Sequence, residues 1–290
     1  MRTNKTPWSV GDTSFVAGSV CWIDVSSTDP AGSRDFYAGL LGWTYRIDRD
    51  PGRRHYTIAQ CGGRPVAGLA GVVVPAGQPV TWTPYLASAN IERIAAVLGR
   101  WGGRVLYGPA DVRGQGRVLI GADPTGGVIG FWEPAASWMF HTTSPGALLW
   151  AELNTWDGAR ADAFFANLFG YCQQQIGDGI GVDYTMWSRG GCRMLGRLQM
   201  NEVWAAPGSA AQWMLHFAVD PQIGTDAAVT RVLELGGRVD VYPYDTEFGR
   251  IARVHDPSGA AFALIDPSQR LESATDLDVG SAAVDDPYDD

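Results

Sequence analysis

The chain of 290 residues has 46% hydrophobic and 18% charged positions, which is enough apolar material for more than one core. At roughly 100–200 residues per domain, this length predicts two domains. The formal net charge of −9 argues against the basic surface with which duplex-DNA-binding proteins neutralise phosphates, so we expect no nucleic-acid partner. Seven acidic residues and no Lys or Arg follow residue 271, which predicts an acidic disordered tail over 268–290.

The cysteines and the chain start indicate a cytoplasmic protein. Four cysteines, at positions 21, 61, 172 and 192, form no C-x-x-C pair and no zinc-ligand spacing. We interpret them as reduced thiols packed as small hydrophobic side chains. Residues 1–14 are polar and lack the apolar stretch of a signal peptide, so they predict an N-terminal arm. No run of 18 or more apolar residues occurs, and we therefore expect no membrane span.

An internal repeat organises most of the chain. Residues 21–43 match residues 149–171 at a constant offset of 128, which aligns Trp22 with Trp150 and Phe36 with Phe164. Later segments repeat as well, since LGRWGGRV (98–105) resembles LELGGRV (233–239) and ADPTGGVIGFWEP (122–134) resembles HDPSGAAFALIDP (255–267). The repeat predicts one domain over 15–134, a linker over 135–145 and a second domain over 146–267.

The second copy divides into two similar modules. Apolar periodicity predicts helices over 159–169 and 225–235, each ended by a glycine. Strands are expected over 148–153, 183–188 and 193–200, and then over 213–219, 238–242, 249–254 and 260–265. We interpret each module as strand, helix and three strands, so the fold class is α+β with four βαβββ modules in the chain.

These modules, the DFYAGLLGW helix (35–43), the LGGRV helix end (235–239) and the DPSG turn (256–259) resemble the vicinal oxygen chelate superfamily. That superfamily includes glyoxalase I, extradiol dioxygenases and bleomycin-resistance proteins. The sequence is most similar to its two-domain actinobacterial glyoxalase/bleomycin-resistance type. The resemblance covers residues 15–267 and implies that modules pair into two glyoxalase-like domains with open, curved sheets.

Metal-dependent relatives bind their ion through His, Gln or Glu side chains on the first and last strands of the modules. Carried onto this sequence, the positions hold Trp22, Tyr85 and Gly130 in the first domain and Trp150, His216 and Ala263 in the second. A fourth position stays unassigned. Tryptophan, glycine and alanine side chains cannot ligate a metal, so we expect no metal and no other cofactor.

Several polar and aromatic residues nevertheless share the predicted cleft faces. Alternation along a strand places Glu152 on the face of Trp150 and Asp24 on the face of Trp22. We predict that Glu152 and His216 form an acid–base pair, with Asp24 and Tyr85 as the weaker equivalents beside His55 and Tyr56. The predicted substrate-binding rings are those of Trp22, Trp150, Trp187, Trp213 and Tyr244.

Two classes of function fit this pattern best, and a third is less favoured. The first is a metal-independent enzyme that isomerises, cyclises, hydroxylates or opens an epoxide of an aromatic or apolar secondary metabolite. The second is a protein that sequesters an antibiotic or metabolite, and the third is a metal-dependent glyoxalase or dioxygenase. Because module pairing can be completed within one chain, either a monomer or a homodimer is consistent with the sequence.

Overall fold

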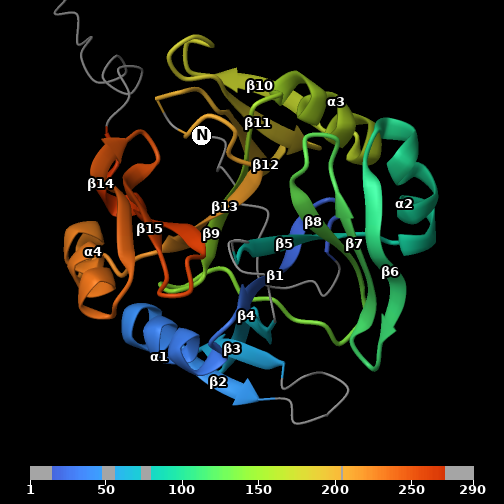
Figure 1. The fold of residues 1–290 in the computed structure, drawn as a ribbon. Coiled ribbons are helices and arrows are strands. Elements are labelled where there is room, and N and C mark those ends of the chain that lie inside the picture. The colour runs from blue at the N-terminus through green and yellow to red at the C-terminus, as the bar shows by residue number, and fades with distance from the viewer. Residues whose placement is uncertain (1–14, 48–55, 73–79, 204, 272–290) are drawn as a thin grey trace, which may run out of the picture.

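The computed structural model describes residues 15–47, 56–72, 80–203 and 205–271, which form two eight-stranded sheets and four α-helices (Figure 1). None of these helices combines the length and the apolar character that a bilayer crossing requires. Both sheets mix parallel and antiparallel pairs and remain open at their edges. The predicted α+β class with open, curved sheets is confirmed.

The first sheet has the strand order β2-β3-β4-β1-β5-β8-β7-β6. Its strands are β1 (Val20–Ser27), β2 (Thr44–Ile47), β3 (Thr57–Cys61), β4 (Arg64–Gly71), β5 (Trp82–Ala87), β6 (Arg104–Val112), β7 (Gly116–Ala122) and β8 (Val128–Pro134). The connecting helices are α1 (Pro30–Leu41), α2 (Ile91–Leu98) and the 3-10 turn η2 (Gly99–Trp101). The two module-opening strands, β1 and β5, therefore pair antiparallel at the centre of the sheet.

The second sheet repeats this topology in the order β10-β11-β12-β9-β13-β16-β15-β14. Its strands are β9 (Leu148–Thr155), β10 (Cys172–Ile176), β11 (Tyr184–Arg189), β12 (Cys192–Gln199), β13 (Gln212–Ala218), β14 (Arg238–Thr246), β15 (Gly249–His255) and β16 (Ala261–Asp266). Helices α3 (Gly158–Phe169) and α4 (Gly224–Glu234) and the 3-10 turn η3 (Pro267–Gln269) complete this half. Strand β10 was not predicted, because its short polar run CQQQI shows little apolar alternation.

The helix ends show why the repeat folds alike twice. Asp29 and Asp157 cap α1 and α3 by accepting hydrogen bonds from backbone N–H groups three residues further on. Gly42 and Gly170 end these helices with φ of 69° and 71°, a left-handed conformation that favours glycine. The matched sequence positions therefore carry matched start and stop signals.

One hydrophobic core joins the two sheets. Helix α1 lies against α4, and α2 lies against α3, so each helix pair brings the two halves together (Figure 1). Tyr37 donates a hydrogen bond to Asp256 at 3.0 Å, and the Trp43 indole donates to the Gly146 carbonyl at 2.8 Å. Buried residues of both halves form a single cluster, so the core does not divide the chain into separate domains. The predicted boundaries at 15–134, 135–145 and 146–267 therefore stay predictions.

The chain ends fall partly outside the described residues. The predicted arm over 1–14 lies outside them entirely, and so does the predicted tail from 272 onward. The first residues assigned to that tail belong to the folded part, since Ser268 and Gln269 lie in η3. The Leu271 N–H also donates to the Thr246 carbonyl at 2.9 Å, which holds this segment against the end of β14.

Candidate functional site

The face of each sheet that lies away from the shared core carries the predicted site positions in register. In the first sheet, Trp22 pairs with Tyr85 across β1 and β5, and Tyr85 pairs with Gly130 across β5 and β8. In the second sheet the same three positions are Trp150, His216 and Ala263. Directly paired residues project from the same side of a sheet, so each trio shares one face.

Asp24 lies at the centre of a hydrogen-bonded cluster on the first face. Its Oδ1 accepts from the Trp22 indole at 2.7 Å and from the Tyr56 hydroxyl, and its Oδ2 accepts from the Tyr85 hydroxyl at 2.9 Å. Burial raises the pKa of the Asp24 carboxyl above its ordinary value, while the bonds from Tyr56, Tyr85 and Trp22 act to lower it. Both tyrosines have pKa values raised well above the ordinary one, first by burial, so they remain neutral donors.

The second face brings together the residues predicted as an acid–base pair. His216 Nε2 lies 3.5 Å from Glu152 Oε2, and their side chains are 8% and 11% exposed. The Trp150 indole donates to the Tyr184 hydroxyl at 2.7 Å. Burial and then the charge of Glu152 hold the pKa of Tyr184 well above its ordinary value. Among the described residues, neither ring nitrogen of His216 has a hydrogen-bond partner within normal geometry.

Tyr184 was missed in the sequence, although the repeat pointed to it as the equivalent of Tyr56. Tyr56 and Tyr184 are separated by the repeat offset of 128, as Asp24 and Glu152 are. Glycines at the paired positions of β4 and β12 make room for them. A Cβ at Gly68 would clash with the Asp24 carboxylate and the Tyr56 hydroxyl, and one at Gly196 would clash with the Tyr184 hydroxyl.

Neither face offers a fitting donor set for the metal that the resemblance implies. On the first face, a side chain at position 130 would collide with the Tyr85 ring, which fills the space above Gly130. The Trp22 indole is a hydrogen-bond donor and has no lone pair to offer. On the second face, His216 and Glu152 lie beside Trp150 and Ala263, which contribute no ligand atom. The part of the chain that the structure describes contains no grouping of three His, Cys, Asp or Glu side chains suited to a metal ion.

A cavity of about 270 Å³ opens on the first face above the Asp24 cluster. Trp132 of β8 and Trp138, from the segment between the sheets, form part of its wall. The Trp138 indole donates to the Cys21 carbonyl at 3.0 Å, and its ring centroid lies 4.8 Å from those of Trp22 and Trp132. Residues 135–145 were predicted as a linker, so the contribution of Trp138 to the cavity was missed.

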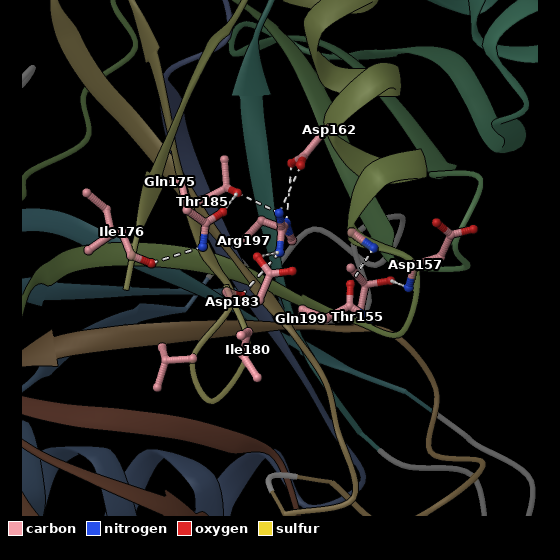
Figure 2. A network of polar contacts seen from close by, with 12 residues as sticks. Thr155, Asp157, Asp162, Gln175, Ile176, Ile180, Asp183, Thr185, Arg197 and Gln199 are labelled. Carbon is pink, nitrogen blue, oxygen red and sulfur yellow. Dashed lines mark hydrogen bonds and ion pairs between the residues drawn. The ribbon is translucent and has the colours of Figure 1, made fainter. Parts of the chain in front are cut away.

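A buried polar network supports the second face from the core side (Figure 2). Arg197 of β12 binds Asp162 of α3 through Nη2 at 2.9 Å, and its Nη1 lies 2.8 Å from Asp183 Oδ1. Arg197 also donates to Thr185 at 2.5 Å. Asp183 immediately precedes Tyr184, so the network fixes the start of the strand that carries this tyrosine.

Two of the predicted substrate-binding rings lie elsewhere. Trp187 and Trp213 pack in the shared core, where Trp187 donates to Asp162 at 2.7 Å and Trp213 contacts Phe165. Strand alternation explains the correction for Trp213, because odd positions of β13 face the core while Met214 and His216 face away. Tyr244 is 36% exposed. Its pKa is raised mainly by burial and, to a smaller extent, by the nearby charge of Glu152. His55 lies outside the described residues.

Comparison with known proteins identifies the family. No family model matches the chain. The anthracycline biosynthesis protein DauV of Streptomyces sp. (strain C5) is 32% identical over 278 residues, which cover 91% of this chain and 98% of that protein. The putative glyoxylase CFP32 of Mycobacterium tuberculosis (strain CDC 1551 / Oshkosh) is 29% identical over 258 residues, with coverages of 87% and 95%.

A solved structure shares the fold at low sequence identity. The Mn(II)-bound glyoxalase from Novosphingobium aromaticivorans superposes with a TM-score of 0.58 and 15% identity, covering 88% of this chain and 86% of that one. The repeated βαβββ modules, the paired open sheets and the full-length relatives agree. The chain belongs to the vicinal oxygen chelate superfamily.

Proposed function

We propose that this protein is an enzyme of secondary metabolism that uses Glu152 and His216 for acid–base chemistry, without a metal, on an aromatic or apolar small molecule. The substrate class follows from two kinds of support. Relatives that align over nearly their full length are named for anthracycline biosynthesis. The rings of Trp150, Tyr184 and Tyr244 also lie near the pair and offer apolar surface to a planar ligand.

The contact between His216 and Glu152 carries this proposal. Both side chains are about nine-tenths buried, and His216 Nε2 lies 3.5 Å from Glu152 Oε2. Among the described residues, no other group forms a hydrogen bond with the His216 ring. Asp24 differs, because three donors already satisfy its carboxylate. Proton transfer therefore fits the second face better than the first.

The pair accounts directly for redox-neutral reactions. One group removes a proton from a carbon or hydroxyl of the substrate, and the other returns a proton to a second atom, so isomerisation and cyclisation balance without further reagents. Epoxide opening balances when one group removes a proton from water or a substrate hydroxyl as that oxygen bonds to the epoxide carbon, and the protonated partner gives a proton to the epoxide oxygen as its bond to that carbon breaks. Hydroxylation would also require dioxygen and two electrons from the substrate or a reductant, which the pair itself does not supply.

A turnover experiment tests the proposal. The purified protein is incubated with a panel of anthracyclines and their aglycones, and liquid chromatography coupled to mass spectrometry records which compounds are consumed, including those converted to isomers of unchanged mass. We expect Glu152→Gln and His216→Ala each to lower turnover by about 10²–10⁴-fold, the usual contribution of a general acid or base, while ligand binding is retained. Full activity in both variants would show that the pair does not carry the reaction.

Sequestration is the second candidate, and the aromatic cavity on the first face favours it. Tight binding of a panel compound with no consumption by the wild-type protein would support sequestration over catalysis. The third candidate, a metal-dependent glyoxalase or dioxygenase, is tested by metal analysis of the purified protein with a chelator control. Stoichiometric metal whose removal abolishes activity would overturn the acid–base proposal.

A further inference from the structure

The cavity on the first face is built mainly from aromatic rings. Six of the eleven residues that line it are aromatic: Trp22, Tyr56, Tyr85, Tyr107, Trp132 and Trp138. They come from β1, β5, β6, β8, the residue before β3 and the segment between the sheets. The volume of about 270 Å³ lies just below the usual range of roughly 300–1,000 Å³ for ligand sites, so a compact group fits it.

The rings are inclined to one another, from 41° between Trp132 and Trp138 to the steeper angles of two further pairs, and so form separate walls. The planes of Trp22 and Trp138 meet at 70°, and those of Tyr85 and Trp132 meet at 90°. Trp138 is held in place by its bond to the Cys21 carbonyl, and the Trp22 indole by its bonds to Asp24 and Tyr56. A group inside the cavity would therefore meet several ring faces and edges that are already fixed.

Asp24 gives this aromatic cavity one negative charge. Among the described residues that line the cavity, it is the one with an ionisable carboxylate, and no Lys, Arg or His lines it. Its three donors hold the carboxylate in position but carry no charge that would cancel it. A fixed carboxylate beside electron-rich ring faces attracts cations and disfavours anions.

We propose that the first-face cavity binds a compact organic cation, a protonated or quaternary amine attached to an apolar body. This site is separate from the Glu152–His216 pair and does not depend on the function proposed for it. The observations that carry the proposal are the six lining rings, the hydrogen bonds that fix Trp22 and Trp138, and the part-buried Asp24 carboxylate among them. Together they form an aromatic cage of the kind that recognises ammonium groups.

The second face carries a positive charge where the first-face cavity has none. Ile120 pairs with Gly130 in the first sheet, whereas Arg253 pairs with Ala263 at the equivalent place in the second. The Arg253 guanidinium lies near Tyr244 and Glu152 and pairs with Asp240 at 3.4 Å, so a cation at this face would meet a fixed guanidinium. The duplicated faces therefore differ in electrostatics, and cation binding is expected only at the first.

Two matched probes test the proposal by isothermal titration calorimetry on the full chain. The first probe is 4-hydroxybenzyltrimethylammonium, and the second is 4-neopentylphenol, in which a carbon replaces the charged nitrogen. We expect the cation to bind at least about tenfold more tightly than its uncharged isostere. Equal affinity, or tighter binding of the neutral probe, would overturn the proposal and assign the cavity to uncharged aromatic ligands.

Three variants locate the binding. Asp24→Asn should weaken the cation by about tenfold and leave the neutral probe nearly unchanged, and circular dichroism checks that the variant is folded. Tyr107→Leu removes a ring that is 59% exposed, so the substitution should disturb folding less than a change in the core. It should weaken binding of the cation about threefold. Glu152→Gln, at the equivalent position of the second face, is the matched control and should leave both affinities unchanged.

The outcomes separate this proposal from the proposed function. Cation binding that survives both Asp24→Asn and Tyr107→Leu, or that is lost in Glu152→Gln, would place the probe elsewhere and refute the cage. Loss of turnover in Glu152→Gln with unchanged cation binding would support both proposals. Unchanged turnover in that variant would refute only the acid–base function, because the probe affinities do not depend on it.

Discussion

Replacement of Arg197 should destabilise the protein strongly, although this residue touches no ligand face. Its side chain is 5% exposed and binds Asp162 through two nitrogens, Nη2 at 2.9 Å and Nε at 3.3 Å. In Arg197→Met, the Asp162 carboxylate would keep, among the described residues, only the Trp187 indole as a side-chain donor. Breaking a buried ion pair from one side typically costs about 3–5 kcal/mol, so we expect a loss of that order.

Equilibrium unfolding in guanidinium chloride, followed by circular dichroism, measures this loss. The double variant Arg197→Met/Asp162→Leu removes both partners and should recover a large part of the stability, because no buried charge is left unpaired. Asp183 is partly exposed and can be solvated by water after the arginine is gone. Glu92→Gln, which breaks a surface pair with Arg117, is the control and should leave stability nearly unchanged.

Two results would refute this reasoning. A loss below about 1 kcal/mol in Arg197→Met would show that the network in Figure 2 contributes little. Additive losses in the double variant would show that Arg197 and Asp162 act independently. If the reasoning holds, Arg197→Met should also weaken ligand binding at the second face, because Asp183 adjoins Tyr184 and the start of β11 would loosen.

Three further predictions concern the two faces. Cation affinity at the first face should fall as the pH is lowered through the folded-state pKa of Asp24, because the carboxylate that attracts the cation is present only above that value. Since burial raises this pKa above that of an ordinary aspartate, about 3.9, titration calorimetry should find the midpoint higher, and Asp24→Asn should abolish the dependence. Gly130→Ala should displace the Tyr85 ring and break its bond to Asp24, costing roughly 1–3 kcal/mol in an unfolding titration; wild-type stability would contradict the packing argument. Trp150→His with Ala263→Glu should add one imidazole and one carboxylate at the positions paired with His216, and calorimetry with Zn²⁺ should then find about one bound equivalent where the wild type binds far more weakly.

The fold could be predicted because its signals are local and occur twice. The offset of 128, the Asp caps, the terminal glycines and the DP turns each specify an element boundary, and the structure repeats them in both halves. The strand β10 carried no such signal, since its residues are mostly polar and exposed. The shared core was also beyond prediction, because helix packing between halves depends on contacts distant in sequence, such as Tyr37 with Asp256.

The candidate site could be predicted only in part. The resemblance placed His216 at a ligand position of the family, and strand alternation placed Glu152 on the face of Trp150; the structure brings the two side chains to 3.5 Å. The rings of Trp187 and Trp213 were misplaced because aromatic content alone does not say which face of a strand a residue occupies. Trp138 was missed because it lies in a connection without periodicity. Arg253 was missed because a single charged residue on a strand usually faces solvent.

The two faces share a repeated backbone but carry different side chains at equivalent positions. The equivalent positions hold Asp24 and Glu152, Tyr85 and His216, and Ile120 and Arg253. On the first face the carboxylate is saturated by phenol and indole donors, which fixes it as a static charge beside an aromatic cavity. On the second face an imidazole without a hydrogen bond among the described residues stands where the first face has a tyrosine. The exchange of Tyr85 for His216, together with that of Ile120 for Arg253, is therefore the basis on which we propose cation binding at the first face and proton transfer at the second.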